Sequence, residues 1–157
     1  MILLLMAVEH RRDFAYTGLY ALPSHFEMEE CTMYFSLGDY TIDTITNETG
    51  GEIIDYGIKM VGAPLEWKEC QGEGIKIGII DTGIDLTHPD LCDRVVRYIN
   101  FAGDDPQNIE DDNGHGTHVA GIVAASRNHY GVVGVAPKSQ LYIAKAFDAA
   151  GNAGSSA

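Results

Sequence analysis

The chain has 157 residues, 45% of them apolar and 21% charged, which is enough for one domain with a hydrophobic core. Ten basic and 23 acidic residues give a net charge of −13, which disfavours nucleic acid and anionic membrane as partners and leaves cation binding, Ca²⁺ included, open. The three cysteines, Cys31, Cys70 and Cys92, have no Cys-x-x-Cys spacing, which favours free thiols over a disulfide framework or a zinc site.

The first 50 residues are typical of an extension rather than a domain, because they show no sustained helical or strand period. The apolar start, Met1 to Val8, follows no basic residues and is too short to span a bilayer. Arg11-Arg12 lacks the apolar run of a twin-arginine signal. With the free thiols, these features favour a cytoplasmic protein, with secretion as the alternative.

The codons for residues 28–33 can contain a bacterial ribosome-binding sequence shortly before the codon of Met33. We hypothesise that translation starts at Met33 and that residues 1–32 are upstream sequence read in frame. Residues 33–50 then remain as a short N-terminal segment ahead of a domain that begins at Gly51.

From Gly51 onward, strand patterns alternate with helical ones. Residues 63–70 carry Pro64 near a helix start, and residues 118–125 are apolar or small on every side, which predicts a buried helix. Short β-branched runs predict three strands, at residues 75–80, 95–101 and 141–147. This alternation predicts an α/β fold with a parallel sheet flanked by helices.

Three further segments are typical of loops. They are the acidic stretch 104–113, the turn-rich connection 131–137 and the Gly/Ala/Ser-rich residues 148–157.

Asp81 directly follows the first predicted strand, at the edge where parallel sheets place their working residues. It fits a reactive carboxylate and fits equally a cap for a turn or for the next helix. The glycine order of a phosphate-binding turn is absent after this strand.

His115 stands between Gly114 and Gly116, which allow close backbone approach and favour an imidazole at the rim of a cleft. Paired with a buried aspartate, such a histidine can act as a base. His118 lies one turn later in the apolar helix and is predicted to be a core histidine. A zinc site of both histidines is disfavoured, because the spacing and the intervening residues differ from the protease zinc motif.

Two motifs together resemble the aspartate and histidine boxes of the subtilisin family of serine proteases (peptidase S8). They are "IGIIDTGIDLTHPDL" at residues 77–91 and "NGHGTHVAGIVAA" at residues 113–125. "GVVGVAP" at residues 131–137 and "LYIAKAF" at residues 141–147 match the segments that follow in that family. The resemblance implies that residues 51–157 form the N-terminal part of a subtilisin-like catalytic domain, with Asp81 as the orienting carboxylate and His115 as the general base.

The resemblance also implies a structural calcium site, because residues 126–132 have the length of the family's calcium loop. Carried across, the side chains of Asp90 and Asn128 and the carbonyls of Ser126, Tyr130 and Val132 supply the ligands. Such an all-oxygen shell suits Ca²⁺. The alternative is a loop that binds nothing, because Arg127 and His129 bring positive charge close to it.

Residues 38–67 resemble the start of the family's intracellular branch, in which a short N-terminal segment covers the active site until it is removed. By this resemblance, residues 33–50 are a possible prosegment. The branch's blocking motif contains a proline, whereas residues 36–40 contain none.

The family's serine box, Gly-Thr-Ser-Met-Ala, is absent from the 157 residues, and Ser155 and Ser156 lie outside such a context. We therefore expect a fragment of a serine endopeptidase that is inactive alone. In the complete enzyme, the resemblance implies that a peptide or protein substrate pairs with Gly151 and Asn152 and packs on Phe147.

Two other functions stay open at this stage. One is a non-catalytic, calcium-binding or regulatory truncated protein, and the other is a metal module built on His115 and His118. For a fragment, we expect further family strands to be missing beside residues 141–147, and hence an exposed apolar edge with low solubility or a molten character.

Overall fold

The computed structural model describes residues 4–5, 34–36 and 51–154. Cys31, the hypothetical start at Met33 and the serines at 155–156 lie outside the described residues, as does most of the proposed prosegment. Cys70 and Cys92 are free thiols, both exposed. Within the described ranges, no helix has the length and apolar character needed to cross a bilayer.

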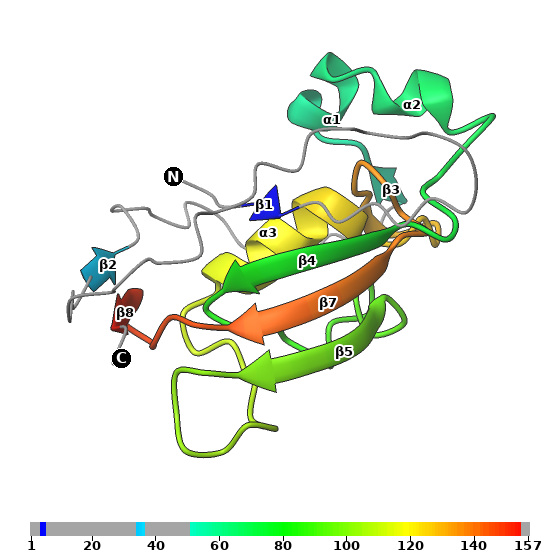
Figure 1. The fold of residues 1–157 in the computed structure, drawn as a ribbon. Coiled ribbons are helices and arrows are strands. Elements are labelled where there is room, and N and C mark those ends of the chain that lie inside the picture. Colours follow the sequence, from blue (N-terminus) through cyan, green and yellow to red (C-terminus); the bar gives the residue numbers. More distant parts are fainter. Residues whose placement is uncertain (1–3, 6–33, 37–50, 155–157) are drawn as a thin grey trace, which may run out of the picture.

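A four-stranded sheet forms the centre of the domain (Figure 1). Its order is β1 (Leu4–Leu5), β4 (Lys76–Asp81), β7 (Gln140–Lys145) and β5 (Val95–Asn100). The pairs β4–β7 and β5–β7 are parallel, with Asp81 opposite Lys145, and β1 pairs antiparallel with β4. The predicted parallel sheet is confirmed, and each predicted strand matches an observed one within two residues.

Helix α3 (His115–Ala124) packs on one face of this sheet, behind β4 in Figure 1. Alternate residues of β4 and β7 point into the interface, because side chains of a strand alternate between its two faces. The core residues are Ile77, Ile79, Ile84, Leu91, Ile109, Val119, Ala120, Ala124, Leu141 and Ile143. This core fixes the start of α3 relative to the carboxyl end of β4.

The prediction that α3 is buried on every side is wrong. His118 and Ile122, one turn apart, form an exposed face, with Ile122 48% exposed. His118 is therefore not a core histidine in the described part of the chain. The small residues that suggested complete burial instead allow close approach to the sheet on the opposite side of the helix.

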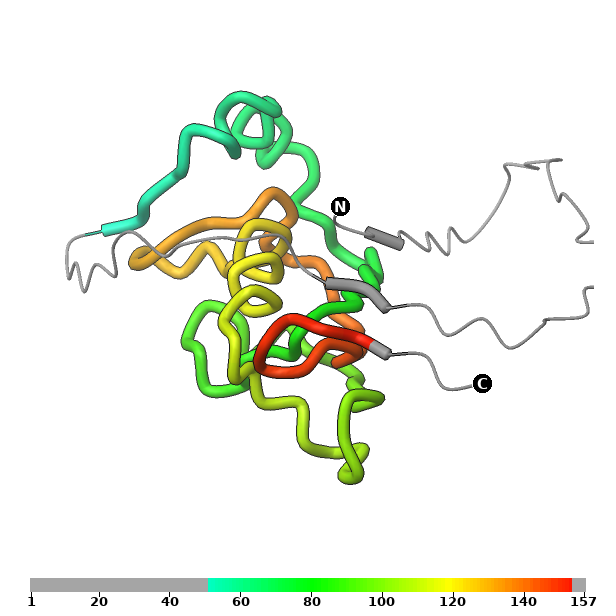
Figure 2. Tube along the Cα trace, turned by 90° about the vertical axis from the view of Figure 1, so that its left-hand side faces the viewer, coloured from blue at the N-terminus to red at the C-terminus, as the bar shows by residue number. Residues whose placement is uncertain are grey.

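A second, smaller core lies at the end of the domain shown at the top of Figure 2. There α1 (Tyr56–Met60) and α2 (Ala63–Glu66) pack near the turn-rich residues 131–137. Trp67 is 6% exposed and donates its indole N–H to the carbonyl of Val135 at 2.9 Å. The helix predicted for residues 63–70 ends at Glu66, and α1 was not predicted from the sequence.

Two short pairings complete the fold. Strand β3 (Glu52–Ile53) pairs in parallel with β6 (Gly131–Val132), and β2 (Tyr34–Ser36) pairs antiparallel with β8 (Asn152–Gly154). The Gly/Ala/Ser-rich stretch therefore contains a strand and is not simply a loop.

The expectation of missing strands beside residues 141–147 is also wrong. Strand β7 is an inner strand, with β4 on one side and β5 on the other. Exposed apolar side chains gather on β5 instead, where Val96 is 47% and Ile99 is 41% exposed. The expected low solubility stays a prediction.

Candidate active site

The site begins where the carboxyl end of β4 meets the first turn of α3. Asp81, the last residue of β4, is 4% exposed, and His115 is the first residue of α3. A Cβ atom on Gly116 would lie 2.2 Å from the carbonyl oxygen of Gly83 and 3.2 Å from Cβ of Asp81. Only glycine permits this approach, so Gly116 is what allows the helix to start against the end of the strand.

Asp81 and His115 are directly bonded. Nδ1 of His115 lies 2.8 Å from Oδ1 of Asp81, and the two side chains are 17% and 5% exposed. The backbone N–H of Thr82 donates to the same carboxylate oxygen at 2.8 Å. A carboxylate on Nδ1 holds the ring proton there and places the lone pair on Nε2, which is the form that accepts a proton. The interpretation of Asp81 as only a turn cap is therefore insufficient.

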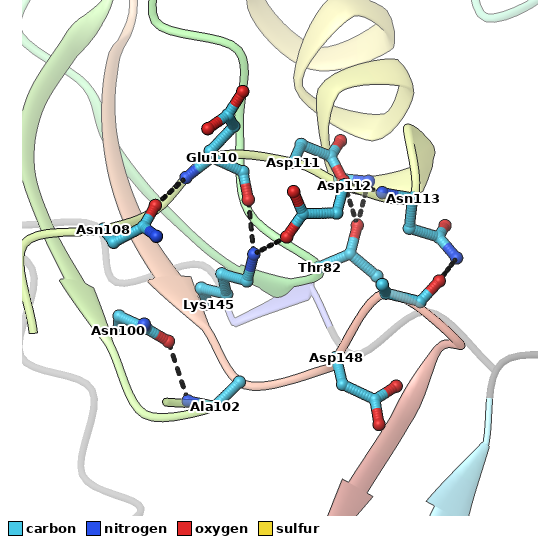
Figure 3. A network of polar contacts seen from close by, with 12 residues as sticks. Thr82, Asn100, Ala102, Asn108, Glu110, Asp111, Asp112, Asn113, Lys145 and Asp148 are labelled. Atoms are coloured by element: carbon cyan, nitrogen blue, oxygen red, sulfur yellow. Dashed lines mark hydrogen bonds and ion pairs between the residues drawn. The ribbon is translucent and has the colours of Figure 1, made fainter. Parts of the chain in front are cut away.

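A second carboxylate, Asp111, accepts hydrogen bonds from Gly114 and Thr117 and from Thr82, the residue after Asp81. Figure 3 shows its contact with Thr82. Burial raises the pKa of the Asp111 carboxyl, but the hydrogen bonds from Thr117, Thr82 and Gly114 outweigh that effect and lower the pKa below its usual value. Asp111 is therefore an anion in the folded protein at neutral pH.

Lys145 anchors the loop that leads into α3. It is the last residue of β7, is 6% exposed, and donates from Nζ to Oδ2 of Asp112 at 2.9 Å and to the carbonyl of Glu110 (Figure 3). One buried ammonium thus fixes residues 110–112 against the carboxyl edge of the sheet.

The residues implied in substrate binding lie beside the same edge. Phe147 is half-buried, and its backbone N–H donates to the carbonyl of Asp81 at 3.3 Å. Gly151 is buried, and Asn152 is exposed at the start of β8. Asn113 ties this region to the histidine loop by donating from Nδ2 to the carbonyl of Ala149 at 3.0 Å. The chain therefore brings all three residues to the side on which Asp81 and His115 lie.

The loop proposed to hold calcium, residues 126–132, contacts Asp90, which is 2% exposed. Asn128 donates from Nδ2 to Oδ1 of Asp90 at 2.7 Å, and the backbone N–H of Ser126 donates to the carbonyl of Asp90 at 2.9 Å. A Cβ atom on Gly131 would lie 2.5 Å from Oδ2 of Asp90, so the loop backbone itself forms the cradle of this carboxylate. A carboxylate and an amide oxygen are ligand types that suit a hard cation, but in this structure Nδ2 of Asn128 faces Asp90 and its Oδ1 accepts from the N–H of Tyr130.

The guanidinium of Arg127 is held by an acidic and an aromatic side chain. Its Nε lies 3.4 Å from Oε2 of Glu52, and its guanidinium stacks over Trp67 at 5.5 Å from the ring centroid. Glu52 also accepts from the backbone N–H of His129 at 2.8 Å. The guanidinium that argued against a cation in the loop is therefore held by Glu52 and Trp67.

In residues 51–154 and the two short N-terminal strands, no group of three or more His, Cys, Asp or Glu side chains could hold a metal ion. A metal site built on His115 and His118 would therefore have no third His, Cys, Asp or Glu ligand among the described residues.

Sequence reasoning missed the roles of Thr82, Asp111 and Lys145. Asp111 fell in a stretch treated as a surface loop, and no local signal marks it, because it stands three residues before the N-cap Gly114 rather than at the cap. Nothing local in the sequence links Lys145 to residues 110–112, because that contact depends on the parallel register of β4 and β7.

A buried aspartate bonded to a histidine at the start of a helix, on the carboxyl edge of a parallel sheet, marks an α/β protein and is the arrangement that these two residues have in serine triads. Residues 72–157, more than half of the chain, match the profile of the subtilase family, peptidase S8. The chain belongs to the subtilase family, and its parallel sheet flanked by helices is consistent with the subtilisin-like α/β fold.

Curated relatives agree with this family. The chain is 46% identical over 102 residues to an intracellular serine protease of Paenibacillus polymyxa. The aligned region covers 63% of the chain and 31% of that protein. It is 43% identical over 110 residues to the major intracellular serine protease of Bacillus subtilis (66% and 34%) and 43% identical over 100 residues to thermitase of Thermoactinomyces vulgaris (62% and 35%). The chain thus spans about a third of the length of these relatives.

Proposed function

We propose that this chain contributes the aspartate and the histidine of a serine endopeptidase that hydrolyses peptide bonds through an Asp–His–Ser triad. The observation that carries the proposal is the 2.8 Å contact between Nδ1 of His115 and Oδ1 of Asp81, two residues 34 positions apart. His115 takes the proton from a serine hydroxyl as that oxygen attacks the peptide carbonyl, and later gives it to the leaving amine. Asp81 fixes the tautomer and stabilises the imidazolium.

The 157 residues themselves contain no serine in the family's nucleophile context. We propose that a polypeptide of these residues alone does not hydrolyse peptides, because the members of a triad act as a unit. No observation favours a non-catalytic regulatory role over this interpretation, and the experiment below separates the two.

The proposed substrate is an extended peptide that adds to the edge of residues 151–154 and packs on Phe147. This proposal is supported by the antiparallel pairing of β2 with β8, in which Tyr34 lies opposite Gly154 and Ser36 opposite Asn152. An edge that accepts one strand can accept a substrate strand in its place. The same pairing supports residues 33–50 as a prosegment that occupies this edge until it is removed.

We further propose a structural Ca²⁺ held by the side chains of Asp90 and Asn128 and by the carbonyls of Ser126, Tyr130 and Val132. The cradle around Asp90 supports it. When bound, the ion supplies positive charge that neutralises the buried carboxylate and ties the loop to the end of α3. A cytoplasmic location is proposed from the intracellular names of two relatives.

The test follows the reading frame beyond the codon of Ala157 and labels its product with a fluorophosphonate, a reagent that reacts with activated serines. We expect the frame to continue to a Gly-Thr-Ser box, its product to be labelled, and the 157-residue polypeptide to stay unlabelled. A stop codon directly after Ala157, with no labelled longer product in the source cell, would refute the peptidase and leave the regulatory role.

A further inference from the structure

Asp111 accepts more hydrogen bonds than an ordinary loop carboxylate. Its Oδ1 accepts from the hydroxyl of Thr82 at 2.7 Å and from the backbone N–H groups of Gly114 at 2.8 Å and Asn113 at 3.3 Å. Its Oδ2 accepts from the backbone N–H and the hydroxyl of Thr117 at 2.7 and 2.6 Å. Two oxygens thus receive five donors, and four of these come from the turn that begins α3 or immediately precedes it.

Asp111 supplies the hydrogen-bond acceptor that the N-cap residue of α3 lacks. The N-cap residue of α3 is Gly114, with φ of 92°, and it has no side chain to accept a hydrogen bond from the first turn. The carboxylate of Asp111 binds the N–H groups of Gly114 and Thr117 from outside the helix. Since His115 lies between these two residues, the carboxylate fixes the backbone that carries the imidazole.

The hydroxyls of Thr82 and Thr117 are each oriented by a backbone N–H group that donates to the hydroxyl oxygen. The hydroxyl of Thr82 accepts from the backbone N–H of Gly116 at 2.9 Å, and that of Thr117 accepts from the backbone N–H of Asp85 at 3.0 Å. Each hydroxyl has one proton to donate. The shortest contact of each hydroxyl is to Asp111, at 2.7 Å for Thr82 and 2.6 Å for Thr117. One carboxylate therefore joins the end of β4, the loop that follows it and the first turn of α3.

The orientation of Thr82 affects Asp81. Oγ1 of Thr82 lies 2.7 Å from Asp111 but 3.3 Å from Oδ1 of Asp81, the oxygen that is bonded to His115. If the Thr82 proton turned to Asp81, it would compete with the imidazole for that oxygen and disperse the negative charge that stabilises an imidazolium.

We propose that Asp111 is a positioning residue for the Asp81–His115 pair. It holds the turn that carries His115, and it keeps the Thr82 proton off Asp81. The inference rests on the proposed role of His115 as a base, but its geometric content can be tested without any peptidase activity.

A carboxylate is required at this position, and the isosteric amide cannot replace it. An asparagine offers one oxygen and one NH₂ group. With the oxygen toward Thr82 and Gly114, the NH₂ group faces the N–H of Thr117. With the amide reversed, the NH₂ group faces Gly114 and donates to Thr82, whose proton then turns to Asp81. Asp111→Asn therefore changes the hydrogen bonding while the volume stays the same.

The experiment measures the proton on Nδ1 of His115 by NMR in the 157-residue chain labelled with ¹⁵N-histidine. A proton shared with a carboxylate gives a low-field resonance that reports the strength of that bond. In Asp111→Asn we expect this resonance to move upfield and to exchange faster with solvent. The matched control is Asp104→Asn, which removes a carboxylate from an exposed position earlier in the same loop. We expect the control to leave the resonance in place.

An unchanged His115 resonance in folded Asp111→Asn would overturn the proposal, as would an equal shift in Asp104→Asn or the absence of the resonance in the unaltered chain. If circular dichroism shows that Asp111→Asn does not fold, Thr82→Ser and Thr82→Ala replace it. The serine keeps the hydroxyl and is expected to keep the resonance, whereas the alanine is expected to shift it. Equal behaviour of these two variants would overturn the proposal.

The positioning role and the proposed function can be refuted independently of each other. A labelled serine in the longer product with no response of His115 to Asp111→Asn refutes the positioning role alone. The opposite pair of results refutes the peptidase and keeps the positioning role.

Discussion

Gly116→Ala tests whether the contact between α3 and β4 is as close as the site requires. The new Cβ would lie 2.2 Å from the carbonyl oxygen of Gly83, whereas ordinary contacts begin at 3.4 Å, so the first turn of α3 must move by about an ångström. Overpacking of this kind costs about 1–3 kcal/mol, and the better helix propensity of alanine returns at most about 1 kcal/mol. We expect a net loss of about 1–2 kcal/mol in the free energy of unfolding.

Gly121→Ala is the matched control, because it lies in the same helix and its Cβ would meet nothing within 4 Å. We expect it to stabilise the chain by up to about 1 kcal/mol. Urea unfolding followed by the fluorescence of Trp67, the only tryptophan and 6% exposed, measures both variants. Equal stabilities of Gly116→Ala and Gly121→Ala would refute the close approach, and with it the reason for a glycine beside His115.

Single contacts give three further predictions. Lys145→Met should lower the free energy of unfolding by about 1–3 kcal/mol, because it leaves the carbonyl of Glu110 without its donor; urea unfolding at the wild-type level would contradict this. Asp90→Asn should abolish the rise in unfolding temperature on adding CaCl₂, and a rise equal to that of the exposed-site control Asp93→Asn would refute the calcium site. A backbone N–H of residue 71 is the main cause that lowers the pKa of Glu73 from 4.5 to about 2, so the stability it contributes is complete above pH 4.5 and is lost as the pH falls to about 2. Glu73→Gln should flatten the fall in urea midpoint over that window, and an unchanged slope would contradict the assignment.

Much of the fold could be predicted from the sequence because its strands are short β-branched runs bounded by turn residues. The segments around Ile77 and Leu141 are of this kind, and both are core strands. The parallel arrangement followed from the helix between them. The order of the sheet could not be predicted, since the position of β7 between β4 and β5 depends on pairing between distant segments.

Some residues of the candidate site could likewise be predicted from the sequence, and others could not. Asp81 and His115 could be recognised because each stands in a specific motif, and the structure brings them to hydrogen-bonding distance. His118 was misassigned because burial was inferred from the apolar neighbours on its own helix, while exposure depends on what other segments cover it. Asp111 was missed because its partners come from two elements, which no local pattern connects.

The central claim is that Asp81 and His115 form the acid–base half of a serine triad, and a comparison of two histidine variants in the longer product of the reading frame tests it most directly. In subtilisin, a member of this family, loss of the triad histidine lowers kcat by about 2 × 10⁶-fold. We predict a loss of that order for His115→Ala on a chromogenic peptide, and kcat close to the unaltered value for the exposed His118→Ala. Retained activity in His115→Ala, or an equal loss in both variants, would contradict the account.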